Sequence, residues 1–293
     1  MSNQVSDNKD CVAPNEVAHG FSEKVMPTKA AYRKSKMFVL AIAAGAFIAF
    51  GAQVCLSVST GTAAALGWGV SKFIGAMVFA TGLITVVLTG AELFTGNVMM
   101  MFSVIEKKIT WAKLLRSWSI VYVGNFVGSM LIAGLVYAGA CYQNADYGLG
   151  VTTMTNALGK VDLSFTQALC RGILCNWLVC LAVWMATSSR RVIGKIFAIF
   201  FPIMTFVASG FEHSIANMFF IPSGVLLRNV PQVVAASGLD AAQLANLTWK
   251  GFFLNNLLPV TIGNIIGALV FVVLLFWIAY LKDDHELQQQ NQD

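Results

Sequence analysis

The stretch Ser209–Met218, with the sequence SGFEHSIANM, lies in the middle of an apolar run that spans residues 196–227. As one α-helix, this run would be about 48 Å long. The hydrocarbon core of a bilayer is only about 30 Å thick, so one straight helix is too long. Polar groups at that depth are costly, about 2.5–3.5 kcal/mol for a charge, and mark a site or a polar seam rather than a lipid-facing surface. We therefore predict a helix that breaks near Gly210, with Glu212, His213 and Ser214 at the break.

The composition indicates a polytopic α-helical membrane protein. Of the 293 residues, 57% are hydrophobic and only 11% are charged, and several apolar stretches reach 18 residues. The net charge of +5 is modest and the basic residues do not alternate with aromatic ones, so we expect no nucleic-acid partner. Residues 1–36 are polar and lack the apolar segment of a signal peptide, so we expect none.

The apolar stretches predict six membrane spans within a transport domain of residues 37–282. The predicted spans are Met37–Val58, Phe73–Val104, Trp118–Tyr142, Phe165–Ala186, Ile196–Leu227 and Phe252–Leu281. The second span is also too long for one straight helix, and polar residues interrupt it at Thr89–Asn97. We predict a separate amphipathic segment, Ile109–Leu115, before the third span. The polar, Gln-rich tail of residues 283–293 is predicted to be disordered.

Residues 1–36 are predicted to form an amphipathic arm. Val17, Phe21 and Val25 recur with helical spacing, so one face of a helix there is apolar, and Pro27 is predicted to end that helix. Basic residues follow where the membrane begins. We interpret the arm as an interfacial anchor held by anionic lipid headgroups. The alternative is a lid that packs beneath the membrane domain and gates it.

The distribution of Lys and Arg predicts the orientation in the membrane. Fourteen of the 19 Lys and Arg residues fall in the arm, in residues 105–117, in residues 187–195 and in the tail. Since cytoplasmic loops carry the excess of positive charge, both termini are predicted to be cytoplasmic. That placement requires an even number of spans, and six satisfies it. We expect a multi-pass protein of the inner (plasma) membrane.

Two motifs recur in the same order and predict an internal repeat. The pattern [TS]-G-x-E-x4-N occurs at Thr89–Asn97 and at Ser209–Asn217, and G-N-x-x-G occurs at Gly124–Gly128 and at Gly263–Gly267. The chain is therefore two copies of a three-span unit. Because three is odd, the copies cross the membrane in opposite directions. Inverted repeats with paired broken helices place a transport pathway near the membrane midplane.

The polar residues of the repeats are candidates for stabilising the breaks. Backbone groups freed at a break need partners inside the protein. Four side chains are predicted to cap or hydrogen-bond the freed helix ends, namely Glu92, Glu212, Asn97 and Asn217. Three others are predicted to hydrogen-bond between helices beside small glycines, namely Asn125, Asn176 and Asn264. The N-termini of the half-helices carry partial positive charge and attract small anions.

His213 differs from the other polar residues because the repeat does not duplicate it. It is the only histidine of the predicted membrane domain, and Leu93 occupies its position in the other copy. A lone buried histidine is more often a core residue with satisfied hydrogen bonds. Its place at a helix break and the asymmetry of the two copies favour a role in a transport pathway.

Four segments resemble the formate–nitrite transporter family, and most closely its formate channels. They are GAELFTG at Gly90–Gly96, GILCNWLVCLA at Gly172–Ala182, GFEHSIANMF at Gly210–Phe219 and PVTIGNIIG at Pro259–Gly267. The resemblance covers about residues 15–282. It implies an all-α, aquaporin-like protomer with its own pore, assembled into a homopentamer in the lipid bilayer. The substrates it implies are formate, nitrite, hydrosulfide or related small monovalent anions.

The resemblance also implies roles for individual residues. His213 becomes the central pore histidine, Thr95 its hydrogen-bonding neighbour, and Glu92 and Glu212 supporting partners. An inner constriction would consist of Leu83, Leu93, Phe94 and Val179, and an outer one of Phe79 and Phe206. Lys160, in the predicted outer loop before the fourth span, would attract anions. The alternative for the apolar residues is ordinary helix packing, and for Lys160 a solvated loop charge.

We therefore expect a channel or proton-coupled transporter for small monovalent anions, with formate as substrate because the segment Gly210–Phe219 resembles the formate members. The alternatives are a nitrite or hydrosulfide channel of the same family, and a channel for neutral solutes. We expect no enzymatic activity, because E-H-x-x-x-N is not the zinc motif H-E-x-x-H and no nucleophile–base pair is evident. We expect no cofactor and no metal site, since the predicted membrane domain has no second histidine.

Overall fold

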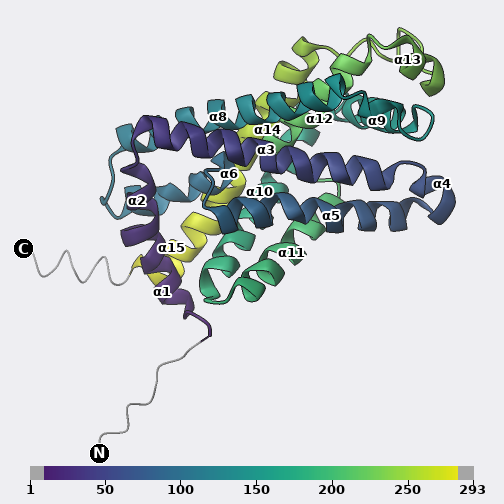
Figure 1. Ribbon diagram of the computed structural model, residues 1–293. Helices are drawn as coiled ribbons and strands as arrows, with labels where there is room; N and C mark the ends of the chain where they lie inside the picture. Colours follow the sequence, from purple (N-terminus) through teal and green to yellow (C-terminus); the bar gives the residue numbers. More distant parts are fainter. Residues whose placement is uncertain (1–9, 283–293) are drawn as a thin grey trace, which may run out of the picture.

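The computed structural model describes residues 10–282, and helices dominate this part of the chain (Figure 1). Five helices in the described part are long and apolar enough to cross a membrane. They are α3 (Lys34–Ser59), α5 (Trp68–Thr89), α8 (Trp111–Ala138), α10 (Phe165–Ser188) and the continuous helix of residues 251–280. The last consists of η4 (Gly251–Leu257), α14 (Leu258–Ala268), η5 (Leu269–Leu274) and α15 (Leu275–Tyr280).

Two apolar segments are broken, as the sequence predicts. After α5, the chain is extended and resumes as α6 (Phe94–Asn97), η2 (Val98–Met100) and α7 (Met101–Ile105). The fifth predicted span is divided into α11 (Val192–Ala208) and α12 (Ser214–Leu227). The predicted all-α membrane architecture, with breaks in its second and fifth spans, is confirmed.

Glycine produces both breaks in the same way. Gly90 and Gly210 each have φ of 72°, in the left-handed region where glycine carries no steric cost. The next N–H groups reach back five residues, from Ala91 to the Val86 carbonyl and from Phe211 to the Phe206 carbonyl, both at 3.0 Å. This hydrogen-bond pattern is a Schellman motif, which ends a helix and satisfies one of its last carbonyls.

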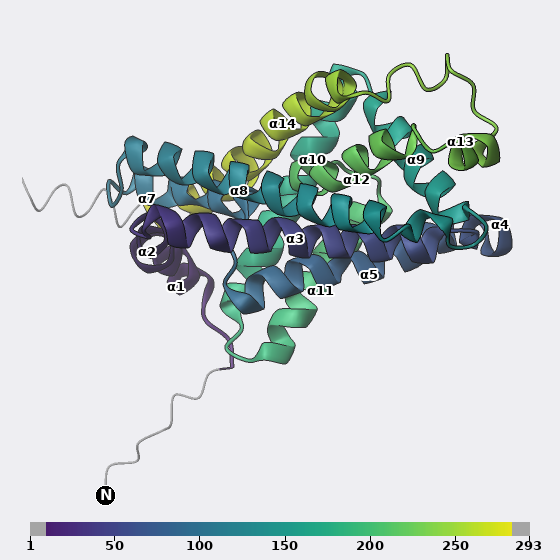
Figure 2. The ribbon, with the colours of Figure 1, turned by 45° about the horizontal axis from the view of Figure 1, so that its top comes forward.

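The helices form an elongated bundle with two distinct ends (Figures 1 and 2). One end, called here the arm end, carries α1 (Pro14–His19), α2 (Met26–Ala30) and α15. The opposite end, called here the α9 end, carries α4 (Thr62–Leu66), α9 (Gly148–Val161) and α13 (Pro231–Ser237). Because α1 contacts α15, the described chain begins and finishes at the same end. This arrangement agrees with an even number of crossings.

Glycines allow the closest helix contacts, which join α3 to α8 and α10 to α14. A Cβ on Gly45 would lie 2.1 Å from the backbone oxygen of Asn125, and one on Gly263 would lie 2.3 Å from that of Leu169. Small residues at such interfaces let two backbones approach, which is how helices associate without a hydrophobic driving force in lipid. The two helix pairs occupy corresponding positions in the two repeats.

The apolar face of the arm packs against the protein, as the alternative interpretation requires, and is not inserted among lipid headgroups. Val17 and Phe21 are only 1% exposed, and the ring of Phe21 stacks on Phe102 and Trp184. The helix also continues past Pro27 to the end of α2. The chain changes from π-helix in η1 (Gly20–Val25) to α-helix at Met26, and Pro27 takes one of the first α-helical positions after that change. Residues 1–9 of the arm lie outside the described part of the chain.

Two other predictions about helices need correction. Ile109–Leu115 is not a separate amphipathic segment, because α8 begins at Trp111 and continues without a break, with the side chain of Thr110 capping its first turn. The region before the fourth span is not a loop, since α9 occupies it. The predicted disorder of residues 283–293 falls outside the described residues.

Candidate functional site

The two breaks bring His213 and Thr95 together at the centre of the bundle. His213 is the last extended residue before α12, and Thr95 lies in the first turn of α6. The Oγ1 atom of Thr95 is 3.0 Å from Nε2 of His213, and both residues are buried. The contact expected between these residues is therefore present, and it joins the two repeats.

The hydrogen bonds of His213 define the tautomer of a neutral ring. His213 is the N-cap of α12, and its Nδ1 accepts the backbone N–H of Ala216 at 3.1 Å. An atom that accepts this bond carries no hydrogen, so the hydrogen of a neutral imidazole is on Nε2. Nε2 then donates to Thr95. At the equivalent N-cap, Leu93 has no group that could make this bond.

Asn125 and Asn264 stabilise the two breaks with the same set of hydrogen bonds. The Nδ2 of Asn264 donates to the carbonyls of Gly172 at 2.8 Å and Glu212 at 3.0 Å, and its Oδ1 accepts the N–H of Ser214 at 2.9 Å. Asn125 makes the matching bonds at the first break. They are to the carbonyls of Ala41 (2.8 Å) and Glu92 (2.9 Å) and from the N–H of Phe94 (2.9 Å). Each amide therefore ties three backbone segments together.

The prediction that the glutamates cap the half-helices is wrong, because their carboxylates bind side chains instead. Oε2 of Glu92 accepts Nδ2 of Asn97 at 2.7 Å, and Oε2 of Glu212 accepts Nδ2 of Asn217 at the same distance. Each carboxylate is also paired with a lysine. The pairs are Lys29 with Glu92 at 3.2 Å and Lys160 with Glu212 at 2.8 Å. These pairs explain how two buried carboxylates are compensated within a membrane domain.

The two lysines occupy equivalent places in the repeats. Lys29 lies in α2, five residues before the first residue of α3, and Lys160 lies in α9, five residues before the first residue of α10. Each repeat therefore contains an amphipathic helix before its three spans. The chain is two copies of a four-element unit, and the amphipathic helix of each copy delivers the counter-ion of that copy's glutamate.

Two further asparagines complete the polar core. Asn176, on α10, donates to the carbonyls of Thr95 at 3.2 Å and Asn264 at 2.7 Å, as an interhelical hydrogen bonder should. Asn256, on η4, was not predicted. It accepts Nδ2 of Asn217 at 2.7 Å and donates to Glu212 at 3.2 Å. An asparagine inside an otherwise apolar span was the signal available in the sequence.

A cavity of about 460 Å³ at the α9 end reaches down to His213, and we call it the vestibule. Its wall includes Glu212 and three basic residues, Lys72, Lys160 and Arg171. Lys160 is thus not a solvated loop charge, since its side chain is mostly buried and its ammonium group lies between Glu212 and the ring of Phe220. The vestibule brings positive charge close to the place where the two repeats meet.

The residues predicted to form constrictions lie in two different environments. Phe79 and Phe206 line the vestibule with their ring centroids 5.7 Å apart, and the ring of Phe206 stacks on His213 at 6.0 Å. Leu83, one turn beyond Phe79 on α5, is buried. Leu93 and Val179 are buried as well.

Phe94 lies in another environment, where its ring packs edge-on against Tyr122 at 4.9 Å and Trp118 at 5.9 Å. These three residues line an apolar groove of about 680 Å³ between α8 and the helix of residues 251–280.

Comparison with known proteins agrees with this geometry. The family model described as formate/nitrite transporter matches residues 16–278. The chain belongs to the formate/nitrite transporter family. Among its relatives is the formate channel FocA of Escherichia coli (strain K12), which is 42% identical over 260 residues, covering 88% of this chain and 91% of FocA. A probable formate transporter of Methanothermobacter thermautotrophicus is also 42% identical, over 85% of this chain and 90% of the relative.

Solved structures of formate/nitrite transporters share the fold. A pentameric formate channel with formate bound superimposes with a TM-score of 0.77 at 39% identity, covering 85% of this chain and 98% of that channel. An ion channel described as a member of the FNT family superimposes with a TM-score of 0.74 at 28% identity, covering 91% of this chain and 98% of the other.

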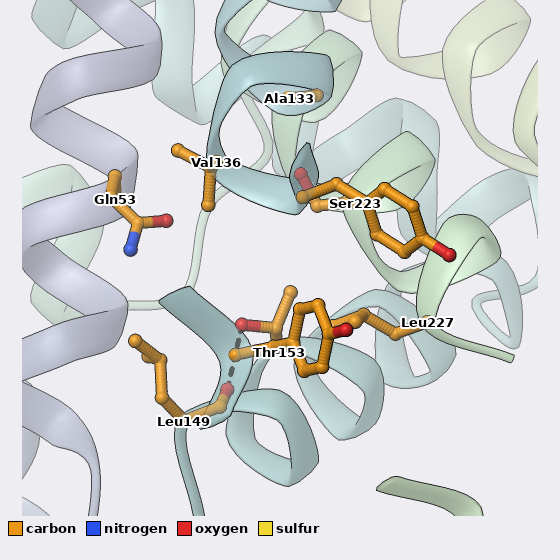
Figure 3. Close-up of a pocket in the computed structure, with 9 residues that line it drawn as sticks. Gln53, Ala133, Val136, Leu149, Thr153, Ser223 and Leu227 are labelled. Atoms are coloured by element: carbon orange, nitrogen blue, oxygen red, sulfur yellow. Dashed lines mark hydrogen bonds between the residues drawn. The ribbon is translucent and has the colours of Figure 1, made fainter. Parts of the chain in front are cut away.

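A second, much smaller cavity in this formate/nitrite transporter is not part of the vestibule. It has a volume of about 20 Å³ and lies among α3, α8, α9 and α12, where Gln53, Thr153 and Ser223 line it (Figure 3). That volume is enough for about one water molecule. It shares no lining residue with the vestibule, so it does not extend the route to His213.

Proposed function

We propose that this protein conducts small monovalent anions, formate first among them, across the inner membrane. The observation that supports this most directly is the vestibule, a positively charged cavity that ends at the His213–Thr95 pair where the two broken helices meet. Formate is chosen because the FocA relative, the Methanothermobacter relative and the superimposed pentameric channel are described as formate channels or transporters.

A bare anion faces a high desolvation cost among Phe79, Phe206 and the buried leucine and valine side chains beyond them. Two routes lower this cost. Either a protonated His213 pairs with the anion, or the anion takes up a proton and crosses as the neutral acid. The bond from the Ala216 N–H to Nδ1 supports the second route, because a protonated ring would turn a second N–H toward it. In this proposal, neutral His213 and Thr95 supply hydrogen bonds to the passing acid.

We also propose that the site serves transport and not catalysis. Thr95 and His213 have the spacing of a nucleophile and a base, at 3.0 Å. In the neutral ring, however, Nε2 is the donor, so it does not accept the threonine proton. The contact therefore supports a pore-lining role over a hydrolytic one.

We further propose a homopentamer with both termini in the cytoplasm. The superimposed formate channel is pentameric, which supports the first statement. The excess of Lys and Arg in the arm, residues 105–117 and residues 187–195 supports the second, together with the contact of α1 with α15. The vestibule would then face the outside of the inner membrane.

Flux into proteoliposomes tests the proposal. We expect uptake of labelled formate that rises as external pH falls, and no accelerated uptake of glycerol. Nitrite and hydrosulfide are measured in the same vesicles to rank the anions. Glycerol uptake without formate uptake would contradict anion transport and favour a neutral-solute channel. Formate uptake independent of pH would retain the channel and contradict the proton-linked route.

A further inference from the structure

Comparison of the two repeats distinguishes residues that stabilise both breaks from residues that occur in one copy only. The glutamates, the paired asparagines and their lysines occur in both copies with the same contacts. His213 has no equivalent, since Leu93 replaces it. Arg171, which lines the vestibule, is a second residue that the other repeat does not duplicate.

The backbone of Arg171 has a structural task that requires no charge. Its carbonyl accepts the N–H of Glu212 at 3.2 Å, immediately before the second break. At the first break, the carbonyl of Leu40 accepts the N–H of Glu92 at the same distance. The two positions are therefore equivalent, and leucine performs this task as well as arginine does. The guanidinium group needs another explanation.

The guanidinium of Arg171 has no acidic partner within the described residues. The ion pairs of this part of the chain involve other basic residues, and the one carboxylate of the vestibule wall, that of Glu212, is taken by Lys160. Lys72 also has no acidic partner within the described residues, and its ammonium group lies 5.9 Å from the centre of the Trp68 ring. The vestibule thus carries two positive charges that no carboxylate of its wall neutralises.

We propose that Arg171, assisted by Lys72, forms an outer binding site that selects carboxylates before they reach Lys160 and His213. A guanidinium presents two parallel N–H groups that match the two oxygens of a carboxylate, whereas an ammonium group is a point charge. The ammonium group of Lys160 is already paired with the carboxylate of Glu212. The outer site therefore supplies both attraction and a preference for planar, two-oxygen anions. The assignment of formate as the carboxylate rests on the proposed function.

Quenching of Trp68 fluorescence tests the outer site without any transport. Iodide is an anionic quencher and acrylamide a neutral one, and Trp68 lies on the vestibule wall beside Lys72. The signal of Trp68 is obtained by difference from Trp68→Phe. We expect Arg171→Gln to lower iodide quenching about threefold at low ionic strength, because accumulated anions fall with the local potential, and to leave acrylamide quenching unchanged. Lys250→Gln, which removes an exposed charge before η4, is the matched control and should change neither.

Arg171→Lys separates charge from shape. It should keep iodide quenching near the parent value, while formate should lose most of its ability to displace iodide. In flux measurements, Arg171→Gln should raise the KM for formate severalfold and leave the maximal rate nearly unchanged. Arg171→Lys should raise the KM for formate and spare that for hydrosulfide.

The outcomes distinguish the inference from the proposed function. Parent protein that accumulates iodide through Arg171 but passes no formate would overturn the proposed function and retain the anion site. Parent protein that passes formate while Arg171→Gln changes neither quenching nor KM would overturn the outer site. Arg171→Lys that behaves as the parent in formate competition would overturn the carboxylate selection.

Discussion

At the scale of single residues, His213 combines a structural and a chemical role. Its Nδ1 caps α12 and its Nε2 faces Thr95, so both ring nitrogens are engaged in the resting molecule. A substitution at this position therefore changes helix capping and pore chemistry together, unless the new side chain can do both. Asparagine can, because it is a good N-cap residue and also carries a donor.

We expect His213→Asn to fold normally and to keep the rise of formate uptake at low pH, because the proposed route protonates the anion and leaves the ring neutral. Asparagine has no group that titrates between pH 5 and 8, so the variant keeps the pH profile of the parent only if the ring does not set that profile. The measurement is initial uptake in proteoliposomes over that pH range. His213→Ala is the contrasting variant, and the lost cap should lower the free energy of unfolding by about 1 kcal/mol. A shifted or flattened pH profile in His213→Asn would contradict the neutral-ring route and show that the ring takes part in proton transfer.

At the scale of elements, glycine and asparagine determine how the helices end and how closely they approach. The breaks follow from one positive φ each, at Gly90 and Gly210, and from one amide that satisfies the freed backbone. The amphipathic helix of each repeat then delivers a lysine to the break. For the first repeat that helix is the arm, which links the arm directly to the polar core.

The contact of α3 with α8 is tested by Gly45→Ala. The added Cβ would meet the Asn125 carbonyl at 2.1 Å, and a backbone atom cannot move away as a flexible side chain could. We expect a loss of about 1–3 kcal/mol in stability, the usual cost of overpacking. Gly134→Ala on the same helix pair is the control, because nothing lies within 4 Å of its Cβ position. Thermal unfolding in detergent compares them, and equal midpoints would contradict the close contact.

The pairing of the arm with the first break is tested by Lys29→Gln. This change leaves the carboxylate of Glu92, which is 1% exposed, without its counter-ion, and breaking a buried pair costs about 3 kcal/mol. We expect a lower unfolding temperature. The double variant that adds Glu92→Gln should recover much of the loss, whereas the exposed Lys24→Gln should have no effect. A Lys29→Gln protein as stable as the parent would show that the ion pair contributes nothing.

At the scale of the whole molecule, two inverted copies of one unit produce a channel-like body with unlike ends. The arm end is covered by helices of the arm, and the α9 end opens into the vestibule. The orientation of this body in the membrane decides which side presents the positive cavity. An exposed cysteine at the arm end, Cys11, makes the orientation measurable.

We expect Cys11 to react with a membrane-impermeant maleimide only in inside-out vesicles, in a variant where it is the sole cysteine. The introduced change Lys250→Cys, at the α9 end, should react only from the outside. Labelling of both from the same side would contradict the proposed orientation. Mass measurement of the detergent-extracted protein should give five chains of 31.6 kDa each, and a smaller assembly would contradict the pentamer.

The breaks and the repeat could be predicted from the sequence, because they depend on the residues at and next to each break. Glycine at a positive φ and costly polar residues inside an apolar run are visible without tertiary information. The hydrogen-bond and ion-pair partners of the polar residues could not be predicted in the same way. The pairs Lys29–Glu92 and Lys160–Glu212 join residues far apart in the chain, and α9 was hidden because its 14 residues are only moderately apolar. Asn256 was missed because its partners come from two other elements.

The side-chain nitrogen atoms of Asn125 and Asn264 determine which substitutions these two positions tolerate. Asn125 and Asn264 each turn an NH₂ group toward two carbonyls and an oxygen toward one N–H. Deamidation, or a substitution by aspartate, would replace that NH₂ group with an oxygen and set a negative charge against both carbonyls. Shortening the side chain to alanine would only leave these groups unpartnered. Aspartate, which is closest to asparagine in shape, should therefore destabilise the protein more than alanine does. A ranking of substitutions by chemical similarity would give the opposite order at both positions.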